Sequence, residues 1–225
     1  MRAQSPRNTG DDSMRIGEAE QIAGTLSKPS KMPGYATSTS AFECKIGSLL
    51  RKVPGSVCEG CYATRANYQY PSVQVAHARR LAGLRHPRWV EAMVTLIQHR
   101  VSEADPYFRW HDSGDLQGEW HLANICEVAR RTPNVRHWLP TREKALVKRY
   151  LRAGGVIPGN LTVRISAPMV DGPAPSVAGG LVSSTVVSQS SADGYACPAR
   201  SQSNQCGTCR ACWSREVQNV AYARH

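Results

Sequence analysis

The stretch PYFRWHDSGDLQGEWHLANICEVARRTPNVRHWLP (106–140) contains one strand–helix–strand unit. Residues 106–115 begin as a short aromatic strand and end in a polar turn, and residues 134–140 form a second strand. Residues 119–131 are predicted to be helical, because apolar residues recur on one face. These residues are Leu122, Ile125, Cys126 and Ala129. Two strands joined through a helix by short links predict parallel pairing, with the helix packed on the sheet.

The same alternation continues on both sides of this stretch. Further strands are expected at residues 34–42, 160–168 and 180–188, and further helices at 72–84, 87–103 and 142–155. Residues 169–180, rich in Gly and Pro, are expected to form a loop. We therefore expect one α/β domain over residues 34–225, a cysteine-rich tail over 195–225, and a flexible polar lead-in over 1–33. Five or six strands are few for a complete eightfold barrel.

Charge and hydropathy limit the partners and the compartment. No segment approaches the roughly 18 apolar residues of a membrane span, and the N-terminus lacks the apolar core of a secretory signal. We therefore expect a cytoplasmic protein without a membrane partner, in which thiols stay reduced. The net charge of +11 suggests nucleic acid as a partner, although Lys and Arg are scattered singly or in pairs rather than concentrated in one arm.

Seven of the eight cysteines form two groups in the sequence. Cys44, Cys58 and Cys61 follow the first expected strand with the spacing C-x13-C-x2-C. The other group has the spacing C-x8-C-x2-C-x2-C and consists of Cys197, Cys206, Cys209 and Cys212. In a reducing compartment such groups indicate metal ligands before disulfides. The eighth, Cys126, is expected to be a buried small apolar residue of the helix 119–131.

The spacing of the second group favours an iron–sulfur cluster over zinc. Structural zinc sites usually pair two separated C-x2-C units, whereas C-x2-C-x2-C can wrap three thiolates around a four-iron four-sulfur cluster. The fourth ligand of such a cluster is often followed by proline, as Cys197 is followed by Pro198. The sequence does not decide whether the seven cysteines serve one cluster or two. Zinc remains the alternative.

Three of the expected strands end in polar residues. Ligands in parallel α/β folds bind beyond the carboxyl ends of the strands, so these residues are candidates for binding a cofactor or a polar ligand. The candidates are Asp112, Ser113, Asp115, Arg142, Arg164 and Ser166. The alternative for Asp112, Ser113 and Asp115 is that they cap or begin the following helix. No catalytic residue is assigned.

Five blocks of sequence resemble a known family. They are SVCEGCYA (56–63), RWHDSGDLQGEWHL (109–122), HWLPTREKALV (137–147), NLTVRISAP (160–168) and CPARSQSNQCGTCRACW (197–213). In this order they resemble a bacteriophage family catalogued as gene product eighty-eight, known especially from phages of actinobacteria. The resemblance implies an iron–sulfur protein of the infected host's cytoplasm on a TIM-barrel-like scaffold, complete or incomplete. It also implies a distant similarity to radical S-adenosylmethionine enzymes.

The radical-enzyme similarity raises S-adenosylmethionine as a second cofactor. Against it, thirteen residues separate Cys44 from Cys58, where the radical-enzyme pattern has three, and no glycine-rich binding segment follows the next strand. Three functional classes therefore remain open. They are a cluster protein with a structural, redox or regulatory role and a nucleic-acid or protein partner, a redox or radical enzyme, and a zinc-stabilised binding protein.

Overall fold

The computed structural model describes residues 14–188 and 194–224. Its α-helices are α1 (Ile16–Ala23), α2 (Lys45–Leu50), α3 (Pro71–Gly83), α4 (Trp89–Arg100), α5 (Glu119–Arg131) and α6 (Lys144–Arg152). Its short 3-10 helices are η1 (Ala41–Glu43), η2 (Tyr62–Thr64), η3 (Ala66–Gln69), η4 (Pro198–Gln202) and η5 (Ala211–Trp213). Its strands are β1 (Tyr35–Thr37), β2 (Tyr107–Trp110), β3 (Arg136–Thr141), β4 (Leu161–Val170), β5 (Val182–Val187), β6 (Tyr195–Ala196) and β7 (Asn219–Ala223).

The strands form one parallel sheet, as predicted. Within residues 14–188 and 194–224 the order of the seven strands is β1-β2-β3-β4-β5-β7-β6, and every neighbouring pair is parallel. β1 and β6 are the two ends of this order, so the pairing of the described strands does not close a barrel. The α/β class with a parallel sheet is confirmed, and the barrel-like scaffold stays a prediction. No helix in the described residues combines the length and the apolar character that crossing a bilayer requires.

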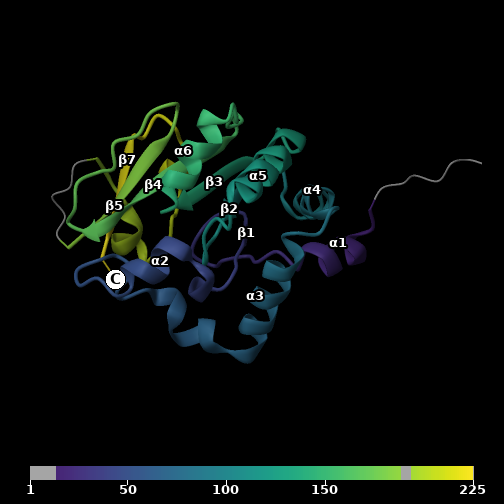
Figure 1. The fold of residues 1–225 in the computed structure, drawn as a ribbon, viewed down its shortest axis with the longest axis horizontal. Coiled ribbons are helices and arrows are strands. Elements are labelled where there is room, and N and C mark those ends of the chain that lie inside the picture. The colour runs from purple at the N-terminus through teal and green to yellow at the C-terminus, as the bar shows by residue number, and fades with distance from the viewer. Residues whose placement is uncertain (1–13, 189–193, 225) are drawn as a thin grey trace, which may run out of the picture.

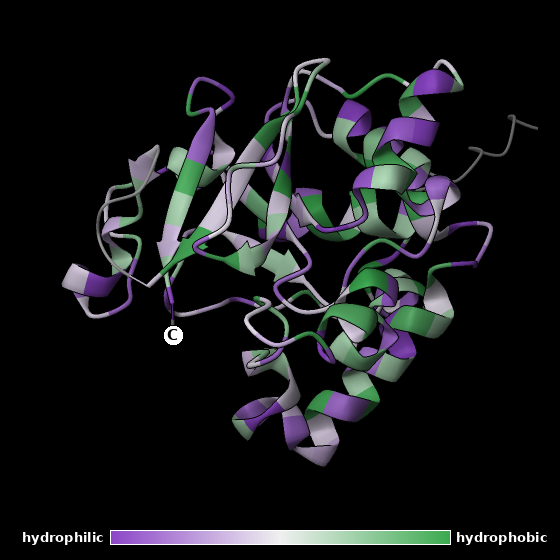
Figure 2. Cartoon of the chain, turned by 60° about the vertical axis from the view of Figure 1, so that its left-hand side comes forward, coloured by the Kyte–Doolittle hydropathy of each residue, from purple (hydrophilic) through white to green (hydrophobic). Residues whose placement is uncertain are grey.

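Helices cover one face of the sheet (Figure 1). Alternate strand residues point to opposite faces, so Phe108 and Trp110 of β2 join the main core while Arg109 between them does not. On α5 the predicted apolar face is buried, and Cys126 is fully inaccessible within this core. The expectation of a buried small apolar residue at Cys126 is confirmed. In Figure 2, hydrophobic green and hydrophilic purple residues alternate along the helices, as expected for helices with one buried face.

The part of the N-terminal lead-in that the structure describes contains helix α1, which the sequence analysis did not predict. Helix α1 buries Ala19 and Ala23 against the main core. Gly83 of α3 lies so close that a Cβ there would be 2.0 Å from the carbonyl oxygen of Ile22. The small residues permit this close packing, and the polar composition of the lead-in concealed it. The rest of the predicted lead-in lies outside the described residues.

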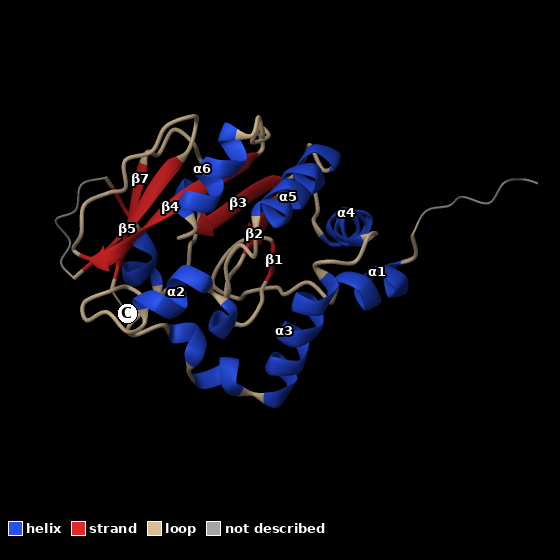
Figure 3. Ribbon diagram, viewed as in Figure 1, coloured by secondary structure: helices blue, strands red, loops and turns tan. Residues whose placement is uncertain are grey.

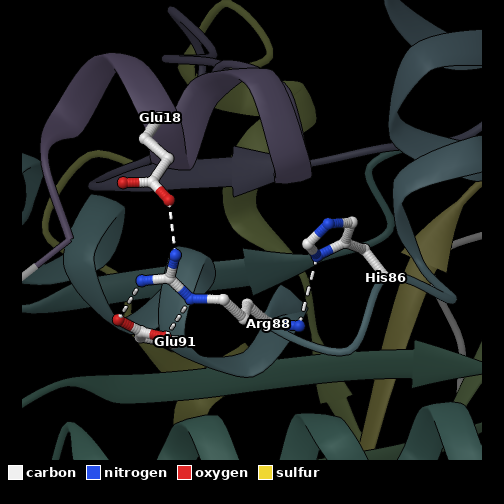
Figure 4. Close-up of polar contacts among 4 residues, drawn as sticks. All are labelled: Glu18, His86, Arg88 and Glu91. Carbon is white, nitrogen blue, oxygen red and sulfur yellow. Dashed lines mark hydrogen bonds and ion pairs between the residues drawn. The ribbon is translucent and has the colours of Figure 1, made fainter.

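A surface ion-pair group also connects α1 to α4. The guanidinium of Arg88, just before α4, contacts the carboxylates of Glu18 on α1 and Glu91 on α4 (Figure 4). The backbone N–H of Arg88 donates to Nδ1 of His86 at 3.2 Å. These groups are solvent-accessible, so they orient α1 more than they stabilise it.

The C-terminal segment covers the other face of the sheet. There Trp138 of β3 packs with Cys212 and Trp213 in a second, smaller apolar cluster. The indole Nε1 of Trp213 donates to the carbonyl oxygen of Phe108 at 3.1 Å. Thr162 Oγ1 donates to the carbonyl oxygen of Trp213 at 2.8 Å. The segment is therefore bonded to both β2 and β4.

The side chain of Arg164 on β4 hydrogen-bonds to this C-terminal segment. This side chain is completely buried. Its two terminal nitrogens donate to four backbone carbonyl oxygens at 2.6–3.1 Å. The acceptors belong to Ser183, Ala211, Ser214 and Val217. Three of them lie in the C-terminal segment, so one guanidinium bonds that segment to β4 and β5.

Replacing this guanidinium should loosen the C-terminal segment. Arg164→Met leaves buried carbonyls without their donor, so we expect the free energy of unfolding to fall by about 2–4 kcal/mol. Urea denaturation followed by tryptophan fluorescence measures this change. Arg136→Met, at an exposed position of β3, is the matched control and should change it by less than about 0.5 kcal/mol. Equal effects of the two variants would contradict the role of Arg164.

Buried histidines should make stability depend on pH. Burial lowers the pKa of His137 to about 3 and that of His111 to about 4, whereas an unfolded histidine titrates near 6.5. The unfolded chain therefore binds more protons as pH falls below 6.5, and stability present at pH 7 is lost. At pH 5 each residue should cost about 2 kcal/mol. Urea denaturation at both pH values should show a smaller loss for His137→Gln than for the wild type, and an unchanged loss for the exposed-site control His99→Gln.

Candidate functional site

The four C-terminal cysteines, here called the tail thiol group, lie in one segment with both ends bonded to the sheet region. The group consists of Cys197, Cys206, Cys209 and Cys212. The backbone N–H of Cys197 donates to the carbonyl oxygen of Ala221 on β7 at 2.8 Å. The backbone N–H of Cys206 donates to the carbonyl oxygen of Lys31, which precedes β1, at 2.9 Å. The segment thus crosses the sheet face that the helices leave uncovered.

Two of the three C-x2-C units, one in each group of cysteines, fold into the same tight turn. The N–H of Cys209 donates to the carbonyl oxygen of Cys206 at 2.9 Å, and the N–H of Cys61 donates to that of Cys58 at 3.2 Å. In the first turn Gly207 has a φ of 53°, which glycine adopts without strain. Such a turn brings the two cysteines of a pair close together, as metal and cluster ligands require.

Burial raises the pKa of three of the tail thiols. It raises the pKa of Cys212 to about 12, although the hydroxyl of Tyr222 and the charge of Arg164 act in the opposite direction. Burial also raises the pKa of Cys197 and of Cys206, and the neighbouring tail thiols add to both shifts. A cation that binds here has to displace protons, and its positive charge then stabilises the thiolates.

Tyrosine and tryptophan side chains surround the tail thiol group. The hydroxyl of Tyr222 lies 3.1 Å from Cys212 Sγ, and that of Tyr195 lies 3.4 Å from Cys209 Sγ. The Trp213 ring packs edge-on against Trp138 and Tyr107, each with its centroid 5.2 Å away. The sequence analysis missed both tyrosine contacts, because nothing in the spacing of Tyr195 or Tyr222 marks them as neighbours of sulfur.

Cys44, Cys58 and Cys61, here called the edge thiol group, lie beyond the carboxyl end of β1. A Cβ built on Gly47 would lie 3.6 Å from Cys44 Sγ and 3.7 Å from Cys58 Sγ, so these two sulfurs flank one glycine. Burial raises the pKa of Cys44 to about 12, and the negative charge of Asp115 adds to the shift. Burial also raises the pKa of Cys58, while the nearby positive charge of Arg142 lowers it.

Asp115 connects the edge thiol group to the neighbouring strand ends. Its carboxylate accepts hydrogen bonds from Thr141 Oγ1 at 2.5 Å and from the backbone N–H groups of Arg142 at 2.9 Å and Leu116 at 2.8 Å. Burial nevertheless raises the pKa of Asp115. This buried carboxyl lies beside Arg142 and the thiols of Cys44 and Cys58, a set of groups suited to binding a polar ligand.

The six predicted binding residues do not form one site. Asp115 and Arg142 lie beside the edge thiol group. Ser113 Oγ donates to the carbonyl oxygen of Thr39, and the backbone carbonyl of Asp112 accepts from the hydroxyl of Tyr62. Arg164 lies under the C-terminal segment with its terminal nitrogens bonded to carbonyls.

The remaining candidate and the helix-cap alternative are also placed by the structure. Ser166 Oγ lies 3.2 Å from the hydroxyl of Ser184 on β5. Helix α5 has Gly118 at its N-cap and no side-chain cap, so the helix-capping alternative for Asp112 and Ser113 is wrong. The structure therefore brings two of the six candidates, Asp115 and Arg142, to the edge thiol group.

The donor set of the tail thiol group fits an iron–sulfur cluster, because four cysteine sulfurs are the ligands that such a cluster requires. The side chains are not gathered around a point. Among residues 14–188 and 194–224, no three His, Cys, Asp or Glu side chains are arranged to hold a metal ion. Binding therefore requires the thiols to rotate toward a common centre.

Comparison with known proteins gives one match. The family model described as Gene product 88 matches residues 10–215, which is most of the chain. No curated protein matches the chain, and no solved structure does. The family match confirms the resemblance at the level of the phage gene-product family and does not address the similarity to radical enzymes. The chain belongs to the Gene product 88 family.

Proposed function

We propose that the protein holds a four-iron four-sulfur cluster in the tail thiol group. The observation that supports this most directly is the placement of four cysteines, with C-x8-C-x2-C-x2-C spacing, in one segment bonded to the sheet by Arg164. A bound cluster supplies one-electron redox chemistry and a rigid link between the four ligands. We propose a structural, redox or regulatory role for it.

The surrounding residues suit such a group. Tyr222 can donate a hydrogen bond to Cys212 Sγ, which favours the ionised sulfur. The positive charges of Arg210 and Arg109 lie near Cys206 and act to lower its pKa, so they offset negative charge on a ligated sulfur. Trp213 is 6% exposed and restricts water at the last cysteine. Each of these effects tunes a reduction potential.

A second proposal concerns the edge thiol group and supports the enzyme alternative. Three thiols beside Asp115 and Arg142 lie at the sheet edge where α/β proteins bind ligands. Three cysteines can hold a cluster with one iron open to a substrate or to S-adenosylmethionine. The similarity to radical enzymes on an incomplete barrel belongs to this alternative. Zinc in either group, in a nucleic-acid-associated protein, is the third alternative.

Iron and sulfide analysis of anaerobically purified protein tests the main proposal. We expect brown protein with about four irons and four sulfides per chain and broad absorption near roughly 400 nm. Cys209→Ala should remove most of the iron, because it removes a ligand. Cys58→Ala should leave the iron of the tail thiol group in place. Cys126→Ala is the matched control, because Cys126 lies in the main core. This variant should change neither the iron content nor the sulfide content.

The other outcomes separate the alternatives. Iron lost only in Cys58→Ala would contradict the tail site and favour the edge site. About eight irons per chain, half of them lost in each of the two variants, would support both sites. Colourless folded protein with zinc and no labile sulfide would overturn the cluster proposal.

A further inference from the structure

The segment from Ala41 to Gly83, here called the outer lobe, has an unusual surface. It contains η1, α2, η2, η3 and α3, and it extends from the end of the sheet at which β1 leads into it (Figure 3). Among the described residues, eight large hydrophobic side chains are exposed, and six of these belong to the outer lobe. The six are Phe42, Leu49, Val53, Tyr62, Tyr70 and Val75. An exposed apolar surface of this kind commonly marks an interaction site.

Half of these side chains are aromatic. Phe42 is 54% exposed, Tyr62 49% and Tyr70 58%. The guanidinium of Arg51 lies over the Phe42 ring, 4.9 Å from its centroid, and Tyr62 packs edge-on against Tyr68 at 5.8 Å. Neighbours thus hold the Phe42 and Tyr62 rings in place, while part of each of the three rings remains accessible. Fixed, accessible rings are what the bases of a single strand stack on.

The outer lobe is also basic. Its exposed cations are Lys45, Lys52, Arg65 and Arg79. Its acidic residues are Glu43 and Glu59. The ion pairs found among the described residues all lie outside the outer lobe, so its cations have no carboxylate partner in this part of the structure. The lobe therefore complements a polyanion, in agreement with the net charge of +11.

A second basic region lacks the rings. Lys144, Lys148 and Arg152 follow one another along α6 beside a groove whose apolar residues are aliphatic. Positive charge alone attracts duplex and single strand alike, whereas exposed rings distinguish the single strand. We therefore expect the outer lobe to prefer a single strand and the α6 region to show no such preference.

We propose that the outer lobe binds single-stranded nucleic acid, with bases stacked on Phe42 and Tyr70 and phosphates held by the neighbouring lysines and arginines. This inference goes beyond the cluster proposal and does not require a cluster, because the binding side chains include no cysteine. Tyr62 extends the stacking surface toward β2 through its bond to the Asp112 carbonyl.

Fluorescence anisotropy with a labelled oligothymidylate of about twenty nucleotides, at near-physiological salt, tests this proposal on the full chain. We expect the single strand to bind at least about tenfold more tightly than a duplex of equal length. Phe42→Ala combined with Tyr70→Ala should weaken binding at least tenfold, because base–aromatic stacking is lost. The iron content of this variant should equal that of the wild type, which separates this proposal from the cluster proposal.

Two control variants test whether a loss of binding comes from the aromatic rings. Leu49→Ala combined with Val75→Ala removes equally exposed side chains without rings and should change binding less than twofold. Lys144→Ala combined with Lys148→Ala should reduce single-strand binding less than the aromatic variant does. No binding, equally tight duplex binding, or equal loss in the aliphatic variant would each overturn the proposal. The last result would instead favour an apolar docking surface for a protein.

Discussion

The buried guanidinium of Arg164 joins the C-terminal segment to the central strands of the sheet. A buried positive charge is costly unless polar groups replace its water, and here four carbonyl dipoles do so. Three of those carbonyls belong to the segment around the tail thiol group, so the charge and the segment depend on each other. No carboxylate of the described residues is paired with Arg164, so its positive charge can act on its neighbours. Cys212 is one of these, and Arg164 acts to lower its pKa.

The sheet consequently has two different faces. Helices α4, α5 and α6 bury the face that includes Phe108, Trp110 and Leu139. The opposite face contains Trp138 and Arg164 and is covered by a segment of short 3-10 helices and turns. Such a segment has few backbone bonds of its own, so it depends on side chains such as Thr162 and Arg164 for its position. The cysteines thus lie in the part of the fold that local secondary structure stabilises least.

Much of the central fold could be predicted from the sequence because periodicity is strong there. The expected helix 119–131 matches α5, and the expected strand 134–140 differs from β3 by two residues at one end and one at the other. Helix α1 was missed because its buried side chains are mostly alanines in a polar context. Strands β6 and β7 were missed because β6 has two residues and β7 follows a cysteine-rich stretch without regular alternation.

The candidate site was predictable in composition but only partly in arrangement. Cysteine spacing indicated two groups, and the polar residues after β2 and β3 pointed to Asp115 and Arg142. Arg164 was predicted to bind a ligand because it lies on a strand with polar neighbours. Its bonds to Ala211 and Ser214 connect residues about fifty positions apart, and no local pattern in the sequence records such a contact.

The order of the strands has a consequence for biosynthesis. β7 lies between β5 and β6, although it follows both in the chain, and among the described strands β6 pairs with β7 alone. The loop with the four tail cysteines connects β6 to β7. While the ribosome is still extending the polypeptide toward β7, this loop has no strand to fix its far end. The loop with the tail cysteines therefore takes its final position only after β7 has been synthesised and has paired with β5 and β6.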